Sequence, residues 1–242
     1  MEPDLHELLR SLRVWDTELP GFEPAAAPEE PLTLFTRWFA EAVAAGQTEP
    51  HTVSLATVDE DGRPDVRTVM LHGADAAGWS FASHATSRKG RQLAAHPHAA
   101  LNFYWPAQGR QVRLRGPVTV APPEEGQADL HARSTGALAA ALVGHQSEVL
   151  PSYEELERAS DAAWSRAQRE PDAPAPTWTL YRLLPDEVEF FQGDTRRRHV
   201  RLTYRRTEPT EPTKPTDPTE PTDRTEPTDR TASGWLKELL WP

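Results

Sequence analysis

Side chains that could bind an anion recur in four places along the chain: Arg67, Ser87–Gly90, Gln111 and Arg197–Arg201. The second of these reads Ser-Arg-Lys-Gly and is predicted to begin a helix, where the backbone N–H groups carry a partial positive charge. Two cations in that first turn raise the electrostatic energy of the helix end unless an anion lies beside them. The pattern predicts a bound phosphate, although a solvated basic surface at Arg88 and Lys89 stays open as an alternative.

Arg67 fits a solvated surface less well. It shares strand parity with Val69 and Leu71, which predicts that its side chain is buried. The neighbouring sequence suggests no partner for its charge, and a buried charge without a partner is costly. We therefore expect the same anion to lie beside Arg67.

The overall composition limits what this phosphate can be attached to. The chain has 242 residues and a formal charge of -11, whereas a nucleic-acid surface needs a dense basic stripe. It contains no cysteine, which excludes disulfides and thiolate chemistry, and its histidines show no metal-ligand spacing. The sequence has no membrane-spanning apolar run and no signal pattern at Met1–Asp4. We expect a soluble, cytoplasmic protein that binds no nucleic acid, membrane or metal.

The elements that must position these residues are a mixture of strands and helices. Helical spacing predicts helices over 5–15, 32–45 and 87–95, and a helical region over 123–169. Strands are predicted over 52–58, 66–72, 79–83, 99–105, 111–120, 178–184, 188–191 and 199–205. The first two strands flank an acidic turn in which Gly62 supplies positive φ, so they form a hairpin. Sequential short strands without a Gly-x-Gly-x-x-Gly motif predict an α+β, mostly antiparallel barrel with peripheral helices, and not a doubly wound sheet.

The chain divides into four parts by composition. Residues 1–30 are predicted to be a helix and a proline-rich tether, and 31–206 are predicted to form the barrel domain. Residues 207–231 are a Thr-Glu-Pro repeat without apolar side chains, predicted to be a disordered insertion, either a tolerated loop or a functional spacer. Residues 232–242 are apolar again and are predicted to return to the barrel as a strand.

A succession of short motifs resembles the pyridoxamine 5'-phosphate oxidase family. The motifs are Pro31–Phe35, Leu55–Asp59 with Asp61–Pro64, Ser87–Leu93, Phe103–Pro106, Arg110–Arg113, Gln146–Ser147, Val188–Gly193 and Trp235–Pro242. They cover nearly the whole chain apart from the repeat, and so many motifs in the same order are far more specific than any one. The resemblance implies an FMN-binding split β-barrel that is active as a homodimer, with the flavin at the subunit interface.

The resemblance also assigns cofactor contacts. It implies that Arg67, Arg88 and Lys89 hold the FMN phosphate, with Ser87 and the helix N-terminus adding donors. The other implied flavin contacts are Ala82 and Ser83 through their backbone, Gln111, Gln146 and Ser147 through polar groups, Phe191 where the family usually has tryptophan, and Arg201 beside the ring. Arg201 would favour negative charge on the reduced flavin.

The implied substrate site departs from the family. Where the family grips the substrate phosphate with lysine, tyrosine, arginine and serine, this chain has His72, Asp129, Arg133 and Ala137. Asp129 would repel a phosphate dianion, although His72 can become cationic at mildly acid pH. The implied catalytic pair over the flavin face is intact as Arg197 and His199, and His199 is a candidate proton acceptor.

These residues predict an FMN-dependent oxidase that moves a hydride from a substrate carbon to FMN, with O2 as the second substrate and H2O2 as the product. The changed phosphate site favours a diverged amine, alcohol or dihydroaromatic substrate, as in phenazine-biosynthetic members of secondary metabolism. A pyridoxamine or pyridoxine 5'-phosphate oxidase of pyridoxine biosynthesis stays open as an alternative. A flavin-binding protein without turnover is a further one. Whether the N-terminal helix closes over the site also stays open.

Overall fold

The structure is a computed structural model that describes residues 4–15, 18–207 and 234–242. Its described strands form one sheet, in which β10-β9-β8-β6-β5-β1-β2 are neighbours in that order. The strands are β1 Thr52–Val58, β2 Pro64–Met70, β3 Gly73–Asp75, β4 Gly78–His84, β5 His98–Trp105, β6 Arg110–Val120, β7 Trp178–Leu183, β8 Glu187–Gln192, β9 Val200–Arg206 and β10 Trp235–Leu240. All of their pairings are antiparallel.

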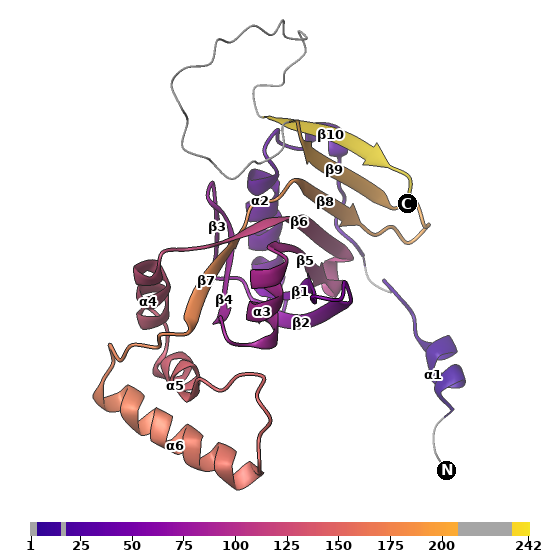
Figure 1. The fold of residues 1–242 in the computed structure, drawn as a ribbon. Helices are drawn as coiled ribbons and strands as arrows, with labels where there is room; N and C mark the ends of the chain where they lie inside the picture. Colours follow the sequence, from indigo (N-terminus) through magenta and orange to yellow (C-terminus); the bar gives the residue numbers. More distant parts are fainter. Residues whose placement is uncertain (1–3, 16–17, 208–233) are drawn as a thin grey trace, which may run out of the picture.

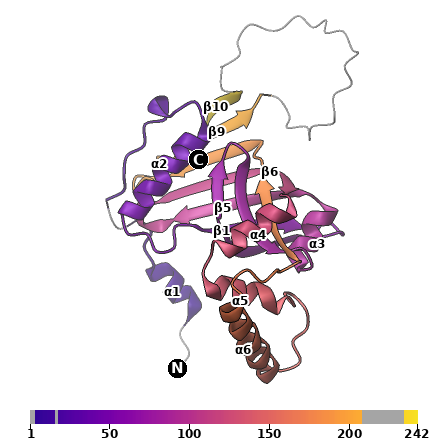
Figure 2. The same cartoon turned by 90° about the vertical axis from the view of Figure 1, so that its left-hand side faces the viewer.

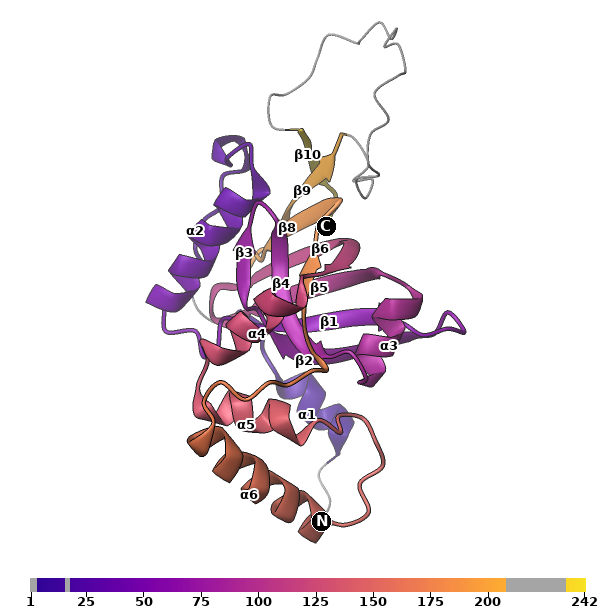
Figure 3. The ribbon, with the colours of Figure 1, turned by 60° about the vertical axis from the view of Figure 1, so that its left-hand side comes forward.

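The long strand β6 makes the sheet curl. Its first part pairs with β5 and β8, whereas Val118–Val120 at its end pairs with β7, which in turn pairs with β4 and β3. The sheet therefore closes on itself as a half-barrel (Figures 1 and 3). This confirms the prediction of an α+β split barrel.

Six α-helices accompany this sheet within the described ranges. They are α1 Leu5–Ser11, α2 Pro31–Ala44, α3 Arg88–Ala95, α4 Pro123–His131, α5 Thr135–Val143 and α6 Tyr153–Arg169. Helix α2 packs across the sheet, while α4, α5 and α6 form a group at one end, beside β7 (Figure 2). Helix α1 stands away from the rest of the chain (Figure 1). No helix in the part of the chain that the structure describes is long and apolar enough to cross a membrane.

The core is built from the inward faces of α2 and the sheet. Leu34, Phe35 and Trp38 of α2 are buried, and the ring of Phe35 lies 5.1 Å from that of Phe103 on β5. Trp38 meets Phe190 of β8 edge to face at 5.2 Å. Each fully buried side chain of this size stabilises the fold by roughly 1.5–3 kcal/mol, so the core fixes how the sheet curls.

The hairpin of β1 and β2 positions Arg67. Gly62 has the positive φ (+80°) predicted for the turn, and the register pairs Leu55 with Arg67. The second strand runs over Pro64–Met70, two residues earlier than predicted, because Pro64 already pairs with Val58. The short strand β3 was not predicted, since three residues carry too little alternation to be recognised.

The two ends of the chain differ from the expectations in different ways. Helix α1 ends at Ser11, short of the predicted Trp15, because Leu12 has extended backbone. The apolar chain end forms β10, which pairs with β9 from Trp235↔Arg206 to Leu240↔Arg201. The predicted disordered repeat at 207–231 lies, except for Thr207, outside the described residues.

Candidate functional site

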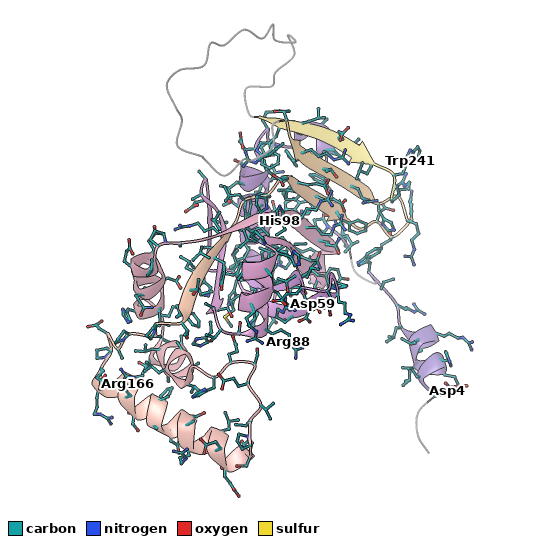
Figure 4. The ribbon with its side chains drawn as sticks, viewed as in Figure 1. Asp4, Asp59, Arg88, His98, Arg166 and Trp241 are labelled. Carbon is teal, nitrogen blue, oxygen red and sulfur yellow. The ribbon has the colours of Figure 1, made fainter. Side chains whose placement is uncertain are left out.

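A cavity of about 650 Å³ lies between β2, β4, the start of α3 and the loop after α5. This volume is typical of a site for a cofactor-sized ligand. Among the residues predicted to bind FMN or substrate, the structure brings together Arg67, His72, Ala82, Ser83, Arg88, Lys89, Gln146 and Ser147 along its wall. Figure 4 shows Arg88 at the start of α3, beside the loop that connects α5 to α6.

The start of α3 is fixed by two local features. Ser87 is fully buried and caps the helix, since its hydroxyl accepts a hydrogen bond from the N–H of Gly90 at 3.2 Å. Gly90 allows a close approach, because a Cβ there would lie 2.3 Å from the carbonyl oxygen of Ala85. The first turn contains no acidic residue, so Arg88 and Lys89 stand at the positive end of the helix, as predicted.

Lys89 is a partly desolvated cation. Its ammonium donates to the hydroxyl of Ser83 and to the side-chain oxygen of Gln146, both at 2.9 Å. Burial lowers the pKa of Lys89, and the positive charge of Arg67 lowers it further. Within the described residues, no carboxylate lies within ion-pair distance of Lys89 or Arg88. The electrostatics of this wall therefore favour an anionic ligand.

The surroundings of Arg67 differ from the expectation that its charge has no partner in the protein. Its side chain is half-buried as predicted, but it has partners within the chain: Asp65 at 2.7 Å, the hydroxyl of Thr57 at 2.6 Å and the side-chain oxygen of Gln92 at 3.0 Å. The prediction that it lacks a protein partner is wrong, because strand parity also brings Asp65 to its face. Arg67 still lines the cavity and contributes positive charge there.

Trp178 is a wall residue that sequence reasoning missed. It begins β7 and lines the same cavity, and its indole N–H is buried without a hydrogen-bond partner. An unpartnered buried donor is costly, so it is well suited to a ligand acceptor. The sequence offered only a tryptophan at a strand start, which ordinarily indicates a core residue. The orphaned donor and the unpaired cations together fit an anionic, aromatic cofactor such as FMN.

A second group of predicted residues lies elsewhere on the sheet. Gln111, Phe191 and Arg201 form one row, because the register pairs Gln111 with Phe191 and Phe191 with Arg201. None of them lines the cavity. Three strand steps separate β6 from β2, about 14 Å along the sheet. Arg201 instead donates to Glu189 at 2.8 Å and to the backbone of Trp241 at 2.9 Å.

The predicted catalytic pair lies beside this row, between β8 and β9. Nδ1 of His199 accepts a hydrogen bond from the backbone N–H of Asp194 at 3.1 Å. The neutral imidazole must then carry its proton on Nε2. In this geometry Nε2 is available as a hydrogen-bond donor, and the role of His199 as a proton acceptor stays a prediction. Arg197 adopts a left-handed backbone conformation with a φ of 63°, which turns the chain at this point.

Trp15 packs on the same pair. Its ring meets that of His199 edge to face at 5.0 Å and lies 6.2 Å from that of Phe191, while Cζ of Arg197 lies 5.7 Å from its centroid. Gly193 provides the space, because a Cβ there would lie 2.9 Å from the indole. The segment that follows α1 therefore covers the predicted catalytic residues of its own chain.

The substituted phosphate positions form a closed network. Nδ1 of His72 lies 2.8 Å from one carboxylate oxygen of Asp129, and Arg133 donates to both oxygens, at 3.2 and 3.0 Å. Burial acts to raise the pKa of Asp129, but hydrogen bonds from His72 and Arg133 outweigh it and lower the pKa to about 2. Ala137 lies one turn into α5 and offers no polar side chain. The carboxylate is ionised, and it already accepts the hydrogen bonds that His72 and Arg133 can donate on this side.

Comparisons with known proteins identify the family of the chain. Residues 39–167 match the family model described as "Pyridoxamine 5'-phosphate oxidase", and residues 178–242 match "Pyridoxine 5'-phosphate oxidase C-terminal dimerisation region". The chain is 45% identical over 188 residues to a pyridoxine/pyridoxamine 5'-phosphate oxidase of Pseudomonas fluorescens, covering 76% of this chain and 87% of that protein. A protein of the same name from Burkholderia lata is 43% identical over 193 residues, covering 80% and 90%.

Solved structures extend the likeness. PhzG from Burkholderia lata, in complex with tetrahydrophenazine-1-carboxylic acid, aligns with a TM-score of 0.76 at 30% identity, covering 94% of this chain and 98% of that one. A pyridoxamine 5'-phosphate oxidase-related, FMN binding protein from Nostoc punctiforme shares the fold, with a TM-score of 0.63 at 18% identity over 89% of this chain and all of that one.

Proposed function

This chain belongs to the pyridoxamine 5'-phosphate oxidase family and is an FMN-dependent oxidoreductase, and we propose that its substrate lacks the 5'-phosphate of the vitamin B6 vitamers. The observation that carries the proposal is the network of Asp129 with His72 and Arg133. A phosphate dianion entering there would meet an ionised carboxylate whose donor neighbours, His72 and Arg133, are already hydrogen-bonded to it. Recognition would need the network to be broken first.

The cofactor fits the cavity described above. Arg88, Lys89 and the N-terminus of α3 would hold the FMN phosphate, with Ser83 and Gln146 as polar neighbours. The indole N–H of Trp178 would donate to another acceptor of the ligand. When bound, FMN supplies the capacity to accept a hydride from carbon and to pass the electrons to O2, giving H2O2.

A second copy of the chain would complete the site. Gln111, Phe191 and Arg201 share one row of the sheet but do not line the cavity of their own chain. In a homodimer with FMN at the interface, the row of one copy would lie against the cavity of the other. The match of residues 178–242 to a dimerisation region supports this arrangement, since Phe191 and Arg201 lie within it.

Arg197 and His199 would orient the substrate. The protonated Nε2 of His199 can donate a hydrogen bond, and the guanidinium of Arg197 can bind an anionic or polar group of the substrate. Trp15 packs against both and would exclude water from this side. These residues hold the substrate carbon in place, and such positioning contributes a large share of the rate in two-substrate reactions.

Two substrate classes fit different observations. PhzG, which aligns over nearly the whole chain, binds a tricyclic carboxylic acid. A dihydroaromatic carboxylic acid carries a single negative charge and suits a site without a free phosphate pocket. The alternative, a pyridoxine or pyridoxamine 5'-phosphate oxidase, is favoured by the names of the relatives at 43–45% identity and by the retained Arg133.

Anaerobic mixing of the FMN-loaded protein with each candidate substrate separates the two classes. We expect slow or no bleaching of the visible flavin band with pyridoxamine 5'-phosphate, and rapid bleaching with a dihydrophenazine carboxylic acid. Rapid bleaching by pyridoxamine 5'-phosphate would overturn the proposed substrate class and establish the vitamin B6 alternative. Photoreduction of the same sample serves as the control that the bound flavin is competent.

A further inference from the structure

Helix α1 presents an apolar stripe that its own chain leaves uncovered. Leu5, Leu8 and Leu9 follow the i, i+3, i+4 spacing of one helix face, and Leu12 follows directly after the end of the helix. All four are exposed, up to 71% for Leu12, and the helix has no buried residue. A helix of seven residues is not stable alone in water, so its stripe must be covered by something.

The segment behind α1 fixes where this stripe can go. Trp15 is seated against Phe191, His199 and Gly193, all within the dimerisation region. Leu12 is only three residues before Trp15, which an extended chain spans in about 10 Å. The stripe therefore begins at the edge of the surface that meets the second copy.

A matching apolar surface follows the cavity wall. After Gln146 and Ser147, the chain exposes Val149, Leu150, Tyr153 and Leu156, with Val149 94% exposed. We name these four side chains the 149–156 surface. In the proposed homodimer the Phe191 row of one copy faces the cavity of the other, so Trp15 of one copy lies near this surface of its partner.

The charges beside the two surfaces are complementary. Arg10 and Arg13 accompany the leucine stripe on the side nearer to Trp15, whereas Glu154 and Glu157 border the 149–156 surface, next to Glu148, which lies 3.0 Å from His145. All five side chains are exposed. Opposite charges at the rim of an apolar contact favour one partner and one orientation over others.

We propose that α1 is an exchanged arm: the leucine stripe of one copy docks on the 149–156 surface of the second copy. The proposal rests on the homodimer of the proposed function, and it adds a contact outside the match to the dimerisation region. Because the stripe and Trp15 lie on one continuous segment, docking of α1 on the partner also holds Trp15 against Arg197 and His199.

Cysteine cross-linking tests the arm directly, because the chain has no cysteine of its own. The FMN-loaded Leu8→Cys/Val149→Cys variant is oxidised mildly and run on a non-reducing denaturing gel. We expect a covalent dimer as the main product. The matched control, Glu7→Cys/Val149→Cys, carries its thiol on the opposite face of α1 and should stay mostly uncrosslinked.

Each other outcome has a distinct meaning. A protein that is dimeric by size-exclusion chromatography but gives no covalent dimer, or the same yield from both variants, overturns the arm and leaves the proposed function intact. An intrachain disulfide that runs as a monomer overturns docking on a second copy. A protein that is monomeric when loaded with FMN overturns the proposed homodimer and the arm with it.

Limited proteolysis gives an independent readout without a covalent bond. In the Leu8→Asp/Leu9→Asp variant, which keeps the barrel intact, we expect trypsin to cleave after Arg10 and Arg13 about tenfold faster than in the parent dimer. Equal cleavage rates would mean that the stripe is uncovered in the parent protein too, and would overturn the arm.

Discussion

Nδ1 of His72 lies 2.8 Å from Oδ2 of Asp129, although 57 positions separate the two residues in the sequence. The histidine is only 7% exposed and the carboxylate 17%. Arg133 completes the contact from the next turn of the same helical region. The charge of Arg133 offsets that of Asp129, and His72 is hydrogen-bonded to the same carboxylate, so the site has few free donors left for a phosphate.

Rebuilding the family pattern should create phosphate recognition. In the His72→Lys/Asp129→Tyr/Ala137→Ser variant, the carboxylate is removed and three donors are added, so KM for pyridoxamine 5'-phosphate should fall about 10- to 100-fold. Steady-state oxidation under saturating O2 measures it. Asp129→Asn alone, which removes the charge without adding a hydroxyl, should gain much less. Equal gains from both variants would contradict the role assigned to the added donors.

The same carboxylate should make stability depend on pH. The pKa of Asp129 falls from its usual 3.8 to about 2 in the folded chain. Its contribution is therefore fully present above pH 4 and is lost as the pH falls towards 2. Asp129→Asn should lower the free energy of unfolding by about 2 kcal/mol at pH 7, with a smaller difference at pH 3. Urea unfolding at both pH values measures this, and a difference that is independent of pH would contradict it.

Lys89→Met should weaken FMN binding about 10- to 100-fold, because a charged donor near the predicted phosphate position is lost. Quenching of flavin fluorescence during titration of the apoprotein measures the dissociation constant. Arg91→Ala is the matched control: Arg91 lies on the same helix but donates to the backbone of Thr86 and does not line the cavity. Similar losses in both variants would point to the net charge of the helix and not to a contact.

Arg197→Ala should keep FMN affinity within about twofold and lower kcat/KM about 100-fold, because positioning is lost while the cavity is intact. Arg198→Ala, its neighbour in the same loop, is exposed and should behave like the parent protein. Absorbance of bound flavin and turnover are measured on the same samples. Loss of flavin from Arg197→Ala would assign Arg197 to the cofactor instead.

Gly90→Ala should destabilise the start of α3. The new Cβ would lie 2.3 Å from the carbonyl oxygen of Ala85, so the helix must shift, at a cost of about 1–3 kcal/mol, and FMN affinity should fall with it. Gly21→Ala is the control, since nothing lies within 4 Å of its Cβ position. Thermal unfolding with and without FMN measures both effects. Equal melting temperatures for the two variants would contradict the steric account.

Local patterns predicted much of what positions the cavity. The basic first turn of α3 and the turn at Gly62 each depend on residues adjacent in sequence, and each was found where expected; of the two possible caps, Thr86 and Ser87, the structure has Ser87. The fold class followed from the strand alternation and from the family resemblance.

Partners that come from distant elements were not predictable in this way. Asp65 and Gln92 around Arg67, the carboxylate of Asp129 at His72 and the indole of Trp15 on His199 all depend on how the sheet curls. Sequence reasoning identified Asp129 as repulsive to phosphate, but its neutralisation by neighbours is a property of the packed structure. The tautomer of a neutral His199 likewise depends on one backbone N–H, that of Asp194.

The junction of β9 and β10 has a practical consequence. Thr207 donates its backbone N–H to the carbonyl of Gly234 at 3.1 Å, next to the Arg206↔Trp235 pair. The pairing of β9 with β10 is therefore complete up to this point. The entropy cost of closing a segment inserted there grows only slowly with the length of the segment. Residues between 207 and 234 are therefore a natural position at which to graft an epitope, a fluorophore tag or a whole reporter domain without redesigning the barrel.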